Sequence, residues 1–521
     1  MTHGLHHTTG ITGDAQANVD FYAGLLGLRL VMRTVNHEDP GTLHLFYGDA
    51  QARPGTLLTF FAWPDTARGR RGVGQATEIG LIVPLEHIGF WVQRFLERGI
   101  RFRGPTPDGE RTLLALEDPD GLPVTLVGTP DAPAPLHWEG SDVPAEASVR
   151  GLHHVTLWSD VPDATGRILT DHLGFAHVGT EEAVRRYRSD APVGHTVLVR
   201  DAHGFWPSAG GVGMLHHVAF RTADDATHGR LAERLGAEEL ELNPLREHGF
   251  FRSLYVREPG GVILEVATDG PGLAAGQPAE RLGLDLVLPE ELEPRRALIE
   301  VVLPAVAAPG EPRPPKRDLG WVHRFVPGND GPTLLLLHGS GGNETSLLAF
   351  AREAAPAAHL LAVRGRSLEE GAPRFFRRDE HGIDQAEMAA EADAIAAFVG
   401  EAAEVYGFDP EGVVALGYSN GANLALASLA RHSGAYAGAI LLRPAVVPED
   451  PPAVDLAGTP VLALLGRTDP YGPQADAAVA FLLERGAAVH VERIEAGHDL
   501  TPEDDVTAVA AWLRAHDLEC V

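Results

Sequence analysis

Cysteine is nearly absent from this 521-residue chain, and long apolar runs are absent too. Cys520 is the only cysteine, which excludes an intramolecular disulfide and a cysteine-rich zinc site and favours a cytoplasmic protein. No run of about eighteen apolar residues occurs, and no basic stretch precedes an apolar one at the N-terminus, so we expect neither a membrane span nor a secretory signal. Basic residues number 42 against 72 acidic ones, and the net charge of −30 argues against nucleic acid or anionic lipid as a partner.

What the sequence does contain is a paired histidine, written three times at the head of an apolar segment. Each pair begins a segment with the pattern of a β-strand, which is followed by helical periodicity and then by further strand patterns. The pairs are His6–His7, His153–His154 and His216–His217. A fourth copy lies in EIGLIVPLEHIGFWVQRFLERGIRF, where Glu78 takes the place of the histidine. The first 270 residues therefore predict four βαβββ units of roughly sixty residues each.

After these repeats the pattern changes twice. Residues 304–316, PAVAAPGEPRPPK, predict a semi-rigid linker because Pro and Ala dominate and little can be buried. Beyond them, apolar segments with the pattern of strands alternate with segments of helical periodicity, which is typical of a parallel sheet with helices on both faces. We expect an α+β region followed by an α/β domain: two units in 1–140, two more with a tail in 141–303, and the α/β domain in 317–521.

A carboxylate in the fourth repeat adds to the evidence for a metal site. Successive side chains along a strand face opposite ways, so each pair sends one imidazole to each face. Glu265 stands between apolar residues in GGVILEVATDG, where an unpaired carboxylate would be costly. Two histidines and one carboxylate with open positions form the facial site of non-haem Fe(II) oxygenases. The repeats alone leave His7 and His154 as rivals for one ligand position.

These segments resemble the vicinal oxygen chelate superfamily, and residues 4–300 are similar to its ring-cleaving dioxygenases that open hydroquinones and chlorohydroquinones. The resemblance is carried by LHHTTGITGDAQANVDFYAGLLGLRLV, VNHEDPGTLHLFYGD with PGTLLTFFAWP, MLHHVAFR, and YVREPGGVILEVATD. It implies O₂ as co-substrate and Fe(II) as cofactor, with Mn(II) or another divalent metal as the alternative. It also implies His7, His217 and Glu265 as ligands, and so favours His7 over His154.

The same resemblance implies groups that act beside the metal. His6 and Tyr255 would be acid–base or substrate contacts, and His248 would meet the substrate where family members have an arginine. The pair His153–His154 goes beyond the family pattern. Two alternatives stay open: a glyoxalase-like lyase or isomerase with another divalent metal, and a module that only binds aromatics.

A second catalytic pattern lies near the end of the chain. GYSNG places Ser419 between strand-like GVVAL and a helical stretch, the setting of a nucleophile elbow. Asp469 and His498 each follow a later strand, in the chain order of a Ser–Asp–His triad. Serine needs a histidine to take its proton, and an acid must fix that histidine's tautomer. Backbone N–H groups near Ser340 and at Asn420 predict an oxyanion hole.

Residues 318–516 resemble the carboxylesterase/phospholipase branch of the α/β hydrolases, through HGSGGNE, GYSNGAN, GRTDP and AGHDL. The resemblance implies a small ester or thioester as substrate and a pocket shaped by RFFRRDEHGIDQAEM, with Phe375 and Phe376 in its lining. Asp499 and Glu495 are rival acids that lie too near the histidine in sequence. We therefore expect a bifunctional enzyme of aromatic or quinone catabolism or detoxification, and a homo-oligomer is compatible with the sequence.

Overall fold

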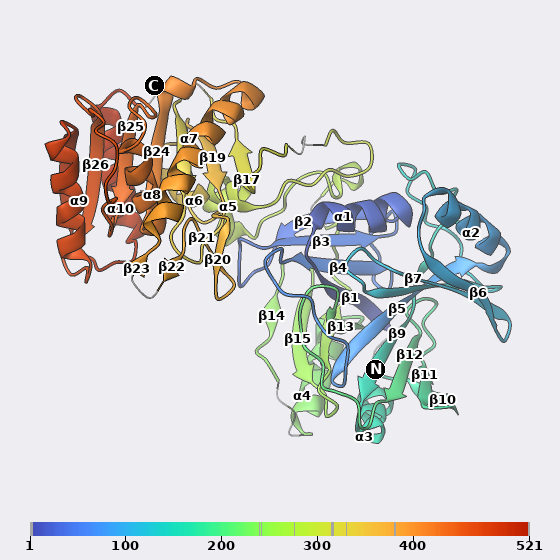
Figure 1. Cartoon of the computed structure of the whole chain (residues 1–521). Coiled ribbons are helices and arrows are strands. Elements are labelled where there is room, and N and C mark those ends of the chain that lie inside the picture. The colour runs from blue at the N-terminus through green and yellow to red at the C-terminus, as the bar shows by residue number, and fades with distance from the viewer. Residues whose placement is uncertain are drawn as a thin grey trace. The chain divides into compact units, whose positions relative to one another are not determined.

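The computed structural model describes residues 4–518 apart from 239, 241, 276, 314–316, 330, 380 and 381, and Cys520 thus lies outside the described residues. The chain divides into two compact units (Figure 1). Unit 1 comprises Met1–Pro294 and Leu303–Pro314, and unit 2 comprises Arg295–Val302 and Pro315–Val521. None of the helices in the described part of the chain has the length and apolar character that crossing a membrane requires.

Unit 1 contains the four βαβββ modules that the repeats predicted. Each module opens with the strand that carries a repeat, continues into a helix, and adds three strands. Module 1 consists of β1 (Leu5–Thr12), α1 (Ala15–Val19), β2 (Arg29–Val35), β3 (Leu43–Gly48) and β4 (Leu57–Ala62). Module 2 consists of β5 (Gln75–Pro84), α2 (Ile88–Glu97), β6 (Phe102–Asp108), β7 (Arg111–Glu117) and β8 (Pro123–Thr129).

The later modules repeat this order. Module 3 consists of β9 (Gly151–Ser159), α3 (Pro162–Arg167), β10 (Ala176–Glu181), β11 (Val184–Arg188) and β12 (Thr196–Asp201). Module 4 consists of β13 (Leu215–Thr222), α4 (Asp225–Gly236), β14 (Arg246–Glu247), β15 (Arg252–Arg257) and β16 (Ile263–Thr268). In α1 and α4 the helix starts after an aspartate, Asp14 or Asp224, whose carboxylate accepts a backbone N–H of the first turn.

The modules do not pair in chain order. Modules 1 and 4 form one curled eight-stranded sheet, in the order β14-β15-β16-β13-β1-β4-β3-β2. Modules 2 and 3 form the other, in the order β10-β11-β12-β9-β5-β8-β7-β6. Antiparallel pairs join the modules at the centre of each sheet, β1 with β13 and β5 with β9. The first and last modules therefore build one concave surface together.

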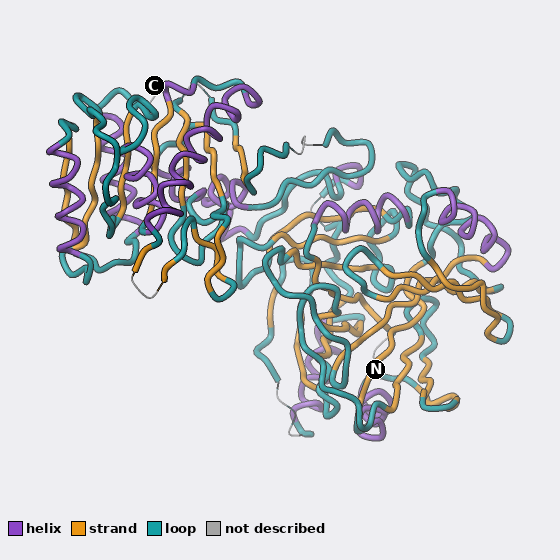
Figure 2. Tube along the Cα trace, in the orientation of Figure 1, coloured by secondary structure: helices purple, strands orange, loops and turns teal. Residues whose placement is uncertain are grey.

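Unit 2 is a three-layer α/β domain, as the apolar strands predicted. Its main sheet has the order β17-β19-β18-β24-β25-β26-β27, parallel except for β17. Figure 2 shows the helices on both sides of these strands. The strands are β17 (His323–Val326), β18 (Thr333–Leu337), β19 (His359–Val363), β24 (Val413–Tyr418), β25 (Gly438–Leu442), β26 (Pro460–Gly466) and β27 (Ala488–Ile494).

Two apolar layers hold the helices of unit 2 on the sheet. One layer involves α7 (Gln385–Tyr406), α8 (Asn420–Leu429) and α9 (Gly472–Glu484). The other involves α5 (Arg296–Val302), α6 (Leu348–Ala354) and α10 (Pro502–Ala515). Two small hairpins complete the unit, β20 (Ser367–Glu369) with β21 (Ala372–Arg374) and β22 (Arg378–Asp379) with β23 (Gly382–Ile383).

The segment that joins the units is divided between them. Val301 of α5 is buried in the same apolar layer as α6, so this helix belongs to unit 2. The residues after it return to unit 1: the Ala307 N–H donates to Gln16 Oε1 at 2.7 Å, and Arg33 forms a 2.6 Å ion pair with Glu311. The tail expected for the first region and the expected linker thus both contain residues that pack on a core.

Removal of α5 should destabilise unit 2. Val301 is buried in the apolar layer of unit 2, and burying such a side chain stabilises by about 1.5–3 kcal/mol. We expect the free energy of unfolding of a fragment that begins at Arg295 to be about 1.5–3 kcal/mol higher than that of one that begins at Arg317. Urea denaturation of the two fragments measures the difference. Equal midpoints would show that α5 is dispensable.

Candidate metal centre and candidate serine triad

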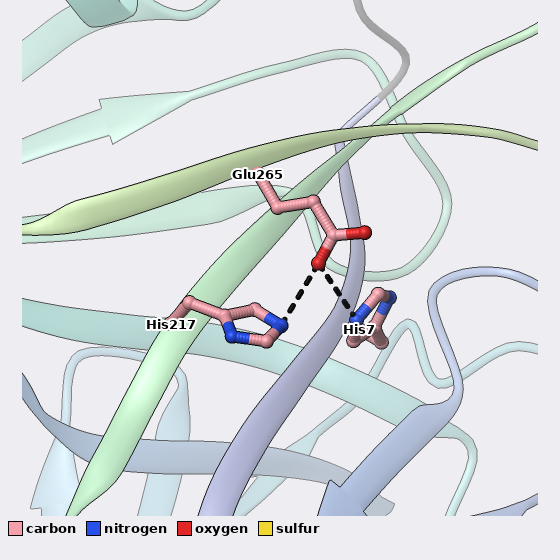
Figure 3. Close-up of side chains that lie close together, drawn as sticks. All are labelled: His7, His217 and Glu265. Atoms are coloured by element: carbon pink, nitrogen blue, oxygen red, sulfur yellow. Dashed lines mark ion pairs between the residues drawn. The ribbon is translucent and has the colours of Figure 1, made fainter. Parts of the chain in front are cut away.

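The strand register of the first sheet brings His7, His217 and Glu265 together. His7 on β1 pairs with Ala219 on β13, and Ala219 pairs with Glu265 on β16, so the three form one row. His217 precedes Ala219 by two residues and therefore faces the same side of the sheet. Figure 3 shows the two imidazoles and the carboxylate pointing at one another.

The distances fit a divalent metal. Glu265 Oε2 lies 3.2 Å from His7 Nε2 and 2.8 Å from His217 Nε2. Ligand atoms at about 2.1 Å from an ion and at right angles to one another would be separated by about 3.0 Å. His217 Nε2 and Glu265 Oε2 are buried and face each other, and no group outside the three side chains is hydrogen-bonded to either atom. Among the described residues no other group of three such side chains brings its ligand atoms within 4.8 Å of one another.

The electrostatics favour the protonation states that bind a metal. Burial by itself would raise the pKa of Glu265, but the adjacent His7 and His217 hold this pKa well below its usual range. Burial lowers the pKa of His217, against the pull of the carboxylate. The centre therefore presents an ionised carboxylate beside a neutral imidazole at His217.

The repeated histidine pairs have a structural explanation. In each pair the two Nδ1 atoms hydrogen-bond to each other, at 2.8 Å in His6–His7, 2.9 Å in His153–His154 and 2.8 Å in His216–His217. The first histidine thus fixes the ring of the second, as outer partners of metal-ligating histidines do. In the first and last pairs this leaves Nε2 of the second ring for the centre.

His6 itself stands behind its neighbour. It is almost fully buried, and its ring contacts Phe251, but it is not part of the cavity lining. Burial lowers its pKa well below the ordinary value, so the ring is neutral. The structure gives His6 contact with His7, and its expected role as an acid–base group or substrate contact stays a prediction.

A cavity of about 200 Å³ is lined by His7 and His217, two of the three candidate ligands. Tyr255 and His248, both expected beside the metal, line it. Tyr255 pairs with Glu265 in the register and stacks edge-on against His217, and burial raises its pKa well above the usual value. His248 Nε2 is buried without a partner, and burial lowers the pKa of His248 to about 4. Much of the remaining wall is aromatic, including Phe61, Trp63, Phe250, Phe251, His44 and His216.

Sequence reasoning missed two residues of this site. Ser253 is fully buried on β15, and its hydroxyl donates to Glu265 Oε1, which leaves Oε2 free for the centre. It lies two residues before Tyr255, so strand alternation could have suggested it. Ala219 lies between His7 and Glu265 in the row, and its side chain is a single methyl group.

The second sheet does not assemble the same ligands. His154 pairs with Gly80 and Thr196, in the position that His217 holds in the first sheet. Glu78 stands opposite Thr156, as His7 stands opposite Ala219, and its carboxylate accepts the Thr125 and Thr156 hydroxyls at 2.7 and 3.0 Å. The residue in the position of Glu265 is leucine, Leu198. The geometry therefore groups His7, and not His154, with Glu265.

A larger side chain at position 219 should close the metal site. Ala219→Leu is expected to abolish stoichiometric binding of a divalent metal, because the added atoms would fill the space between His7 and Glu265. Metal analysis after anaerobic loading and gel filtration measures this. Thr156→Leu, the equivalent change in the second sheet, is the control and should leave the bound metal unchanged. Full loading of the Ala219 variant would place the metal elsewhere.

In unit 2, Ser419 occupies the turn between β24 and α8. Its φ of 51° is a strained conformation that holds a nucleophile at the end of a strand. The flanking glycines are needed because the chain packs closely here: a Cβ at Gly421 would come within 2.0 Å of the Leu337 carbonyl oxygen. At Gly417 a Cβ would come within 2.4 Å of the Gly421 carbonyl oxygen.

The expected partners meet at Ser419. Its Oγ lies 2.9 Å from His498 Nε2, and His498 Nδ1 lies 2.9 Å from Asp469 Oδ2. All three follow parallel strands, β24, β26 and β27, so they gather at one edge of the sheet. The rival Glu495 instead forms an exposed ion pair with Arg467. Asp469, whose side chain is 3% exposed, is thus the acid in contact with the histidine.

The other residues expected here differ in position. Asn420 directly follows the serine, is buried, and accepts the Phe375 N–H through Oδ1 at 2.9 Å. Ser340 lies in the exposed turn after β18. The rings of Phe375 and Phe376 are fully buried in the apolar layer with α7 and α8. This corrects the expectation that they line an ester pocket: they pack in the core, and Phe375 holds Asn420 through its backbone.

Known proteins resemble the two units separately. Residues 4–126 match the family described as the Glyoxalase/Bleomycin resistance protein/Dioxygenase superfamily. MhqO of Bacillus subtilis (strain 168), named as a ring-cleaving dioxygenase, is 35% identical over 299 residues, which are 57% of this chain and 95% of MhqO. The chlorohydroquinone/hydroquinone 1,2-dioxygenase of Sphingobium indicum is 28% identical over 301 residues, 56% of this chain and 92% of that enzyme. MhqD of Bacillus subtilis (strain 168), named as a hydrolase, is 39% identical over 185 residues, 35% of this chain and 92% of MhqD.

Proposed function

The chain belongs to the ring-cleaving dioxygenases of the glyoxalase superfamily, with an α/β hydrolase as its second unit, and on this premise we propose a bifunctional enzyme. Unit 1 is proposed to be an Fe(II)-dependent dioxygenase for hydroquinone-type aromatics. Unit 2 is proposed to be a serine esterase. The observation that carries the first proposal is the buried group of His7, His217 and Glu265 at the base of an aromatic cavity.

The cavity supports a substrate with a single ring. A cavity of about 150 Å³ holds benzene, so one of about 200 Å³ accommodates a monocyclic phenol with small substituents. The aromatic walls provide flat surfaces for the ring. One relative carries hydroquinone in its name, and the resemblance of the sequence points to the same compounds.

Two neutral groups are positioned to bind the hydroxyl groups of such a substrate. Tyr255 remains a phenol at neutral pH, because burial raises its pKa, and it lies beside the ligands. His248 has an unpartnered Nε2 in the cavity wall, and its low pKa keeps the ring neutral. Such a nitrogen can accept a hydrogen bond from a phenolic hydroxyl without adding a buried charge.

The reaction proposed for unit 1 is ring opening next to a hydroxylated carbon. A bound ferrous ion would relay electrons from the substrate to O₂ and act as a Lewis acid. One ring carbon–carbon bond breaks, and both oxygen atoms enter the product, a semialdehyde that also carries a carboxylate. The chain itself would hold the ring in an aromatic cavity, where neutral His216 and His248 can accept hydrogen bonds from the phenolic hydroxyls.

Oxygen consumption with a panel of hydroquinones and catechols tests this proposal. After anaerobic Fe(II) loading, we expect hydroquinones to drive oxygen uptake and Glu265→Gln to abolish it. Glu78→Gln, the matched change in the second sheet, should keep full uptake. His248→Ala is expected to raise KM by about tenfold, the effect of one lost hydrogen bond of about 1.4 kcal/mol. Turnover without oxygen would favour a lyase or isomerase, and binding without turnover would favour a module that only binds aromatics.

The triad geometry supports ester hydrolysis by unit 2. Ser419 Oγ can transfer its proton to His498 Nε2 while it attacks a carbonyl carbon, and Asp469 holds the imidazole in the required tautomer. The backbone N–H of Asn420, with one near Ser340, would stabilise the oxyanion. Histidine then protonates the leaving alcohol or thiol, and water releases the acid. Small carboxylic esters or thioesters are the substrates proposed.

Hydrolysis of p-nitrophenyl acetate tests the triad. We expect Ser419→Ala to lower kcat by on the order of a million-fold and to prevent labelling by a fluorophosphonate. Asp469→Asn should lower kcat by about 10⁴-fold, because the wrong tautomer of His498 is then stabilised. Glu495→Gln is the control and should stay within about twofold, since its exposed ion pair contributes little. A large loss in the Glu495 variant with a small one in Asp469→Asn would identify a different acid.

The fusion itself suggests that both reactions serve one route of aromatic or quinone catabolism or detoxification. In Bacillus subtilis the relatives of the two units are separate proteins. A hydroquinone opened by O₂ contains no ester bond, so we do not propose that one unit passes its product to the other. A cytoplasmic location is proposed from the scarcity of cysteine.

A further inference from the structure

We infer that Arg443 is a positioning residue of the hydrolase, which holds the loop carrying His498 in register with Ser419 and Asp469. The inference rests on the serine hydrolase proposed for unit 2. Arg443 follows β25 directly, a strand that contributes no triad member. Its guanidinium is completely buried, which is unusual for arginine and requires a full set of partners.

The guanidinium donates hydrogen bonds to the backbone of the histidine loop just before and just after His498. Arg443 Nε donates to the Gly497 carbonyl at 3.1 Å, and Nη2 donates to the Asp499 carbonyl at 3.4 Å. His498 lies between these two residues. The loop backbone is thus fastened immediately before and after the histidine, so its ring can meet the serine at a fixed distance.

The same residue also connects the other two triad members. The Ser419 N–H donates to the carbonyl of Leu442, the residue before Arg443, at 2.9 Å. The Arg443 backbone N–H and Nη1 both donate to the Leu464 carbonyl, at 3.0 and 3.2 Å. Leu464 belongs to β26, the strand that leads to Asp469. Leu442 and Arg443 therefore link the serine turn, the aspartate strand and the histidine loop.

A buried carboxylate completes the arrangement. Asp505, also fully buried, accepts Arg443 Nη1 at 2.9 Å and Nη2 at 3.0 Å. Its Oδ2 accepts the Thr501 N–H at the start of α10 as well. All five N–H groups of the guanidinium thus have acceptors, which lysine with three donors at one point could not reproduce.

The backbone of Arg443 carries a further sign of specialisation. Its φ is 54°, a conformation that costs energy for a residue other than glycine and persists where surrounding contacts impose it. Ser419, with φ 51°, is its direct neighbour through the Leu442 carbonyl. Two strained residues therefore meet at the carboxyl edge of the sheet, one supplying the nucleophile and the other its support.

Arg443→Lys in the full chain tests the inference. Because a displacement of about 1 Å can cost about 10²-fold in rate, we expect kcat for p-nitrophenyl acetate to fall by about 10- to 100-fold with KM nearly unchanged. Fluorophosphonate labelling of Ser419 should slow by the same factor, and the acid limb of the pH–rate profile should move. Arg431→Lys is the matched control: Arg431 pairs bidentately with Asp393 in the same unit but touches no triad element.

Hydrogen exchange of the peptide around His498 gives a readout that does not need catalysis. We expect faster exchange there in Arg443→Lys and no change in Arg431→Lys. If the wild type exchanges as expected but is not labelled at Ser419, the hydrolase proposal fails while the loop contact stands. Unchanged exchange and unchanged kcat in the Arg443 variant would overturn the positioning role.

A double variant separates a loss of positioning from a loss of folding. Arg443→Met with Asp505→Leu replaces the buried ion pair by apolar side chains, a change that is often neutral or stabilising. It removes every contact from the guanidinium to the histidine loop. We expect the double variant to stay folded, with a lower melting temperature because the Gly497 and Asp499 carbonyls and the Thr501 N–H lose their partners, and to show the same loss of kcat as Arg443→Lys. Wild-type kcat in a folded double variant would contradict the inference.

Discussion

The candidate metal centre depends on one strand register, that of β1, β13 and β16. A shift of one residue between two of these strands would turn every side chain of the moved strand to the opposite face. His7 and Glu265 share a row only because Ala219 stands between them, and Ser253 reaches Glu265 from the next strand. The interleaved pairing of modules 1 and 4 therefore positions the ligands, the carboxylate's support and the cavity walls in one step.

Both candidate sites require an imidazole ring to be held in one orientation. In unit 1 the Nδ1 of His7 is engaged by His6, and in unit 2 the Nδ1 of His498 is engaged by Asp469. In each arrangement Nε2 of the same ring points at the candidate site, toward Glu265 from His7 and toward Ser419 from His498. The partners differ because the tasks differ: a ligand needs a fixed ring, whereas a general base must also become charged during turnover, and a carboxylate stabilises that charge.

Much of this could be read from the sequence. The repeats predicted four modules, and the apolar strands with GYSNG predicted an α/β domain with a nucleophile turn. What stayed hidden depends on neighbours that are distant in the chain. The role of Arg443 depends on partners on other strands and loops, and no local spacing in the sequence marks it. Alternation with Tyr255 places Ser253 on the right face of its strand, but its contact with Glu265 depends on the strand pairing. The placement of His6 behind its neighbour, and of Phe375 in the core, likewise follows from packing that residue type does not specify.

The pairing of the first module with the last also sets the order in which the two sheets can form during synthesis. Modules 2 and 3 are neighbours along the chain, so their shared sheet closes through short loops and can form early on the ribosome. Strand β1 is made before the other strands of the sheet, yet its partner strand β13 and Glu265 are made more than 200 residues after it. Until then its inner edge is unpaired. His7, His217 and Glu265 can thus come together only after module 4 emerges, and a truncated chain that ends before module 4 would expose an unpaired strand edge.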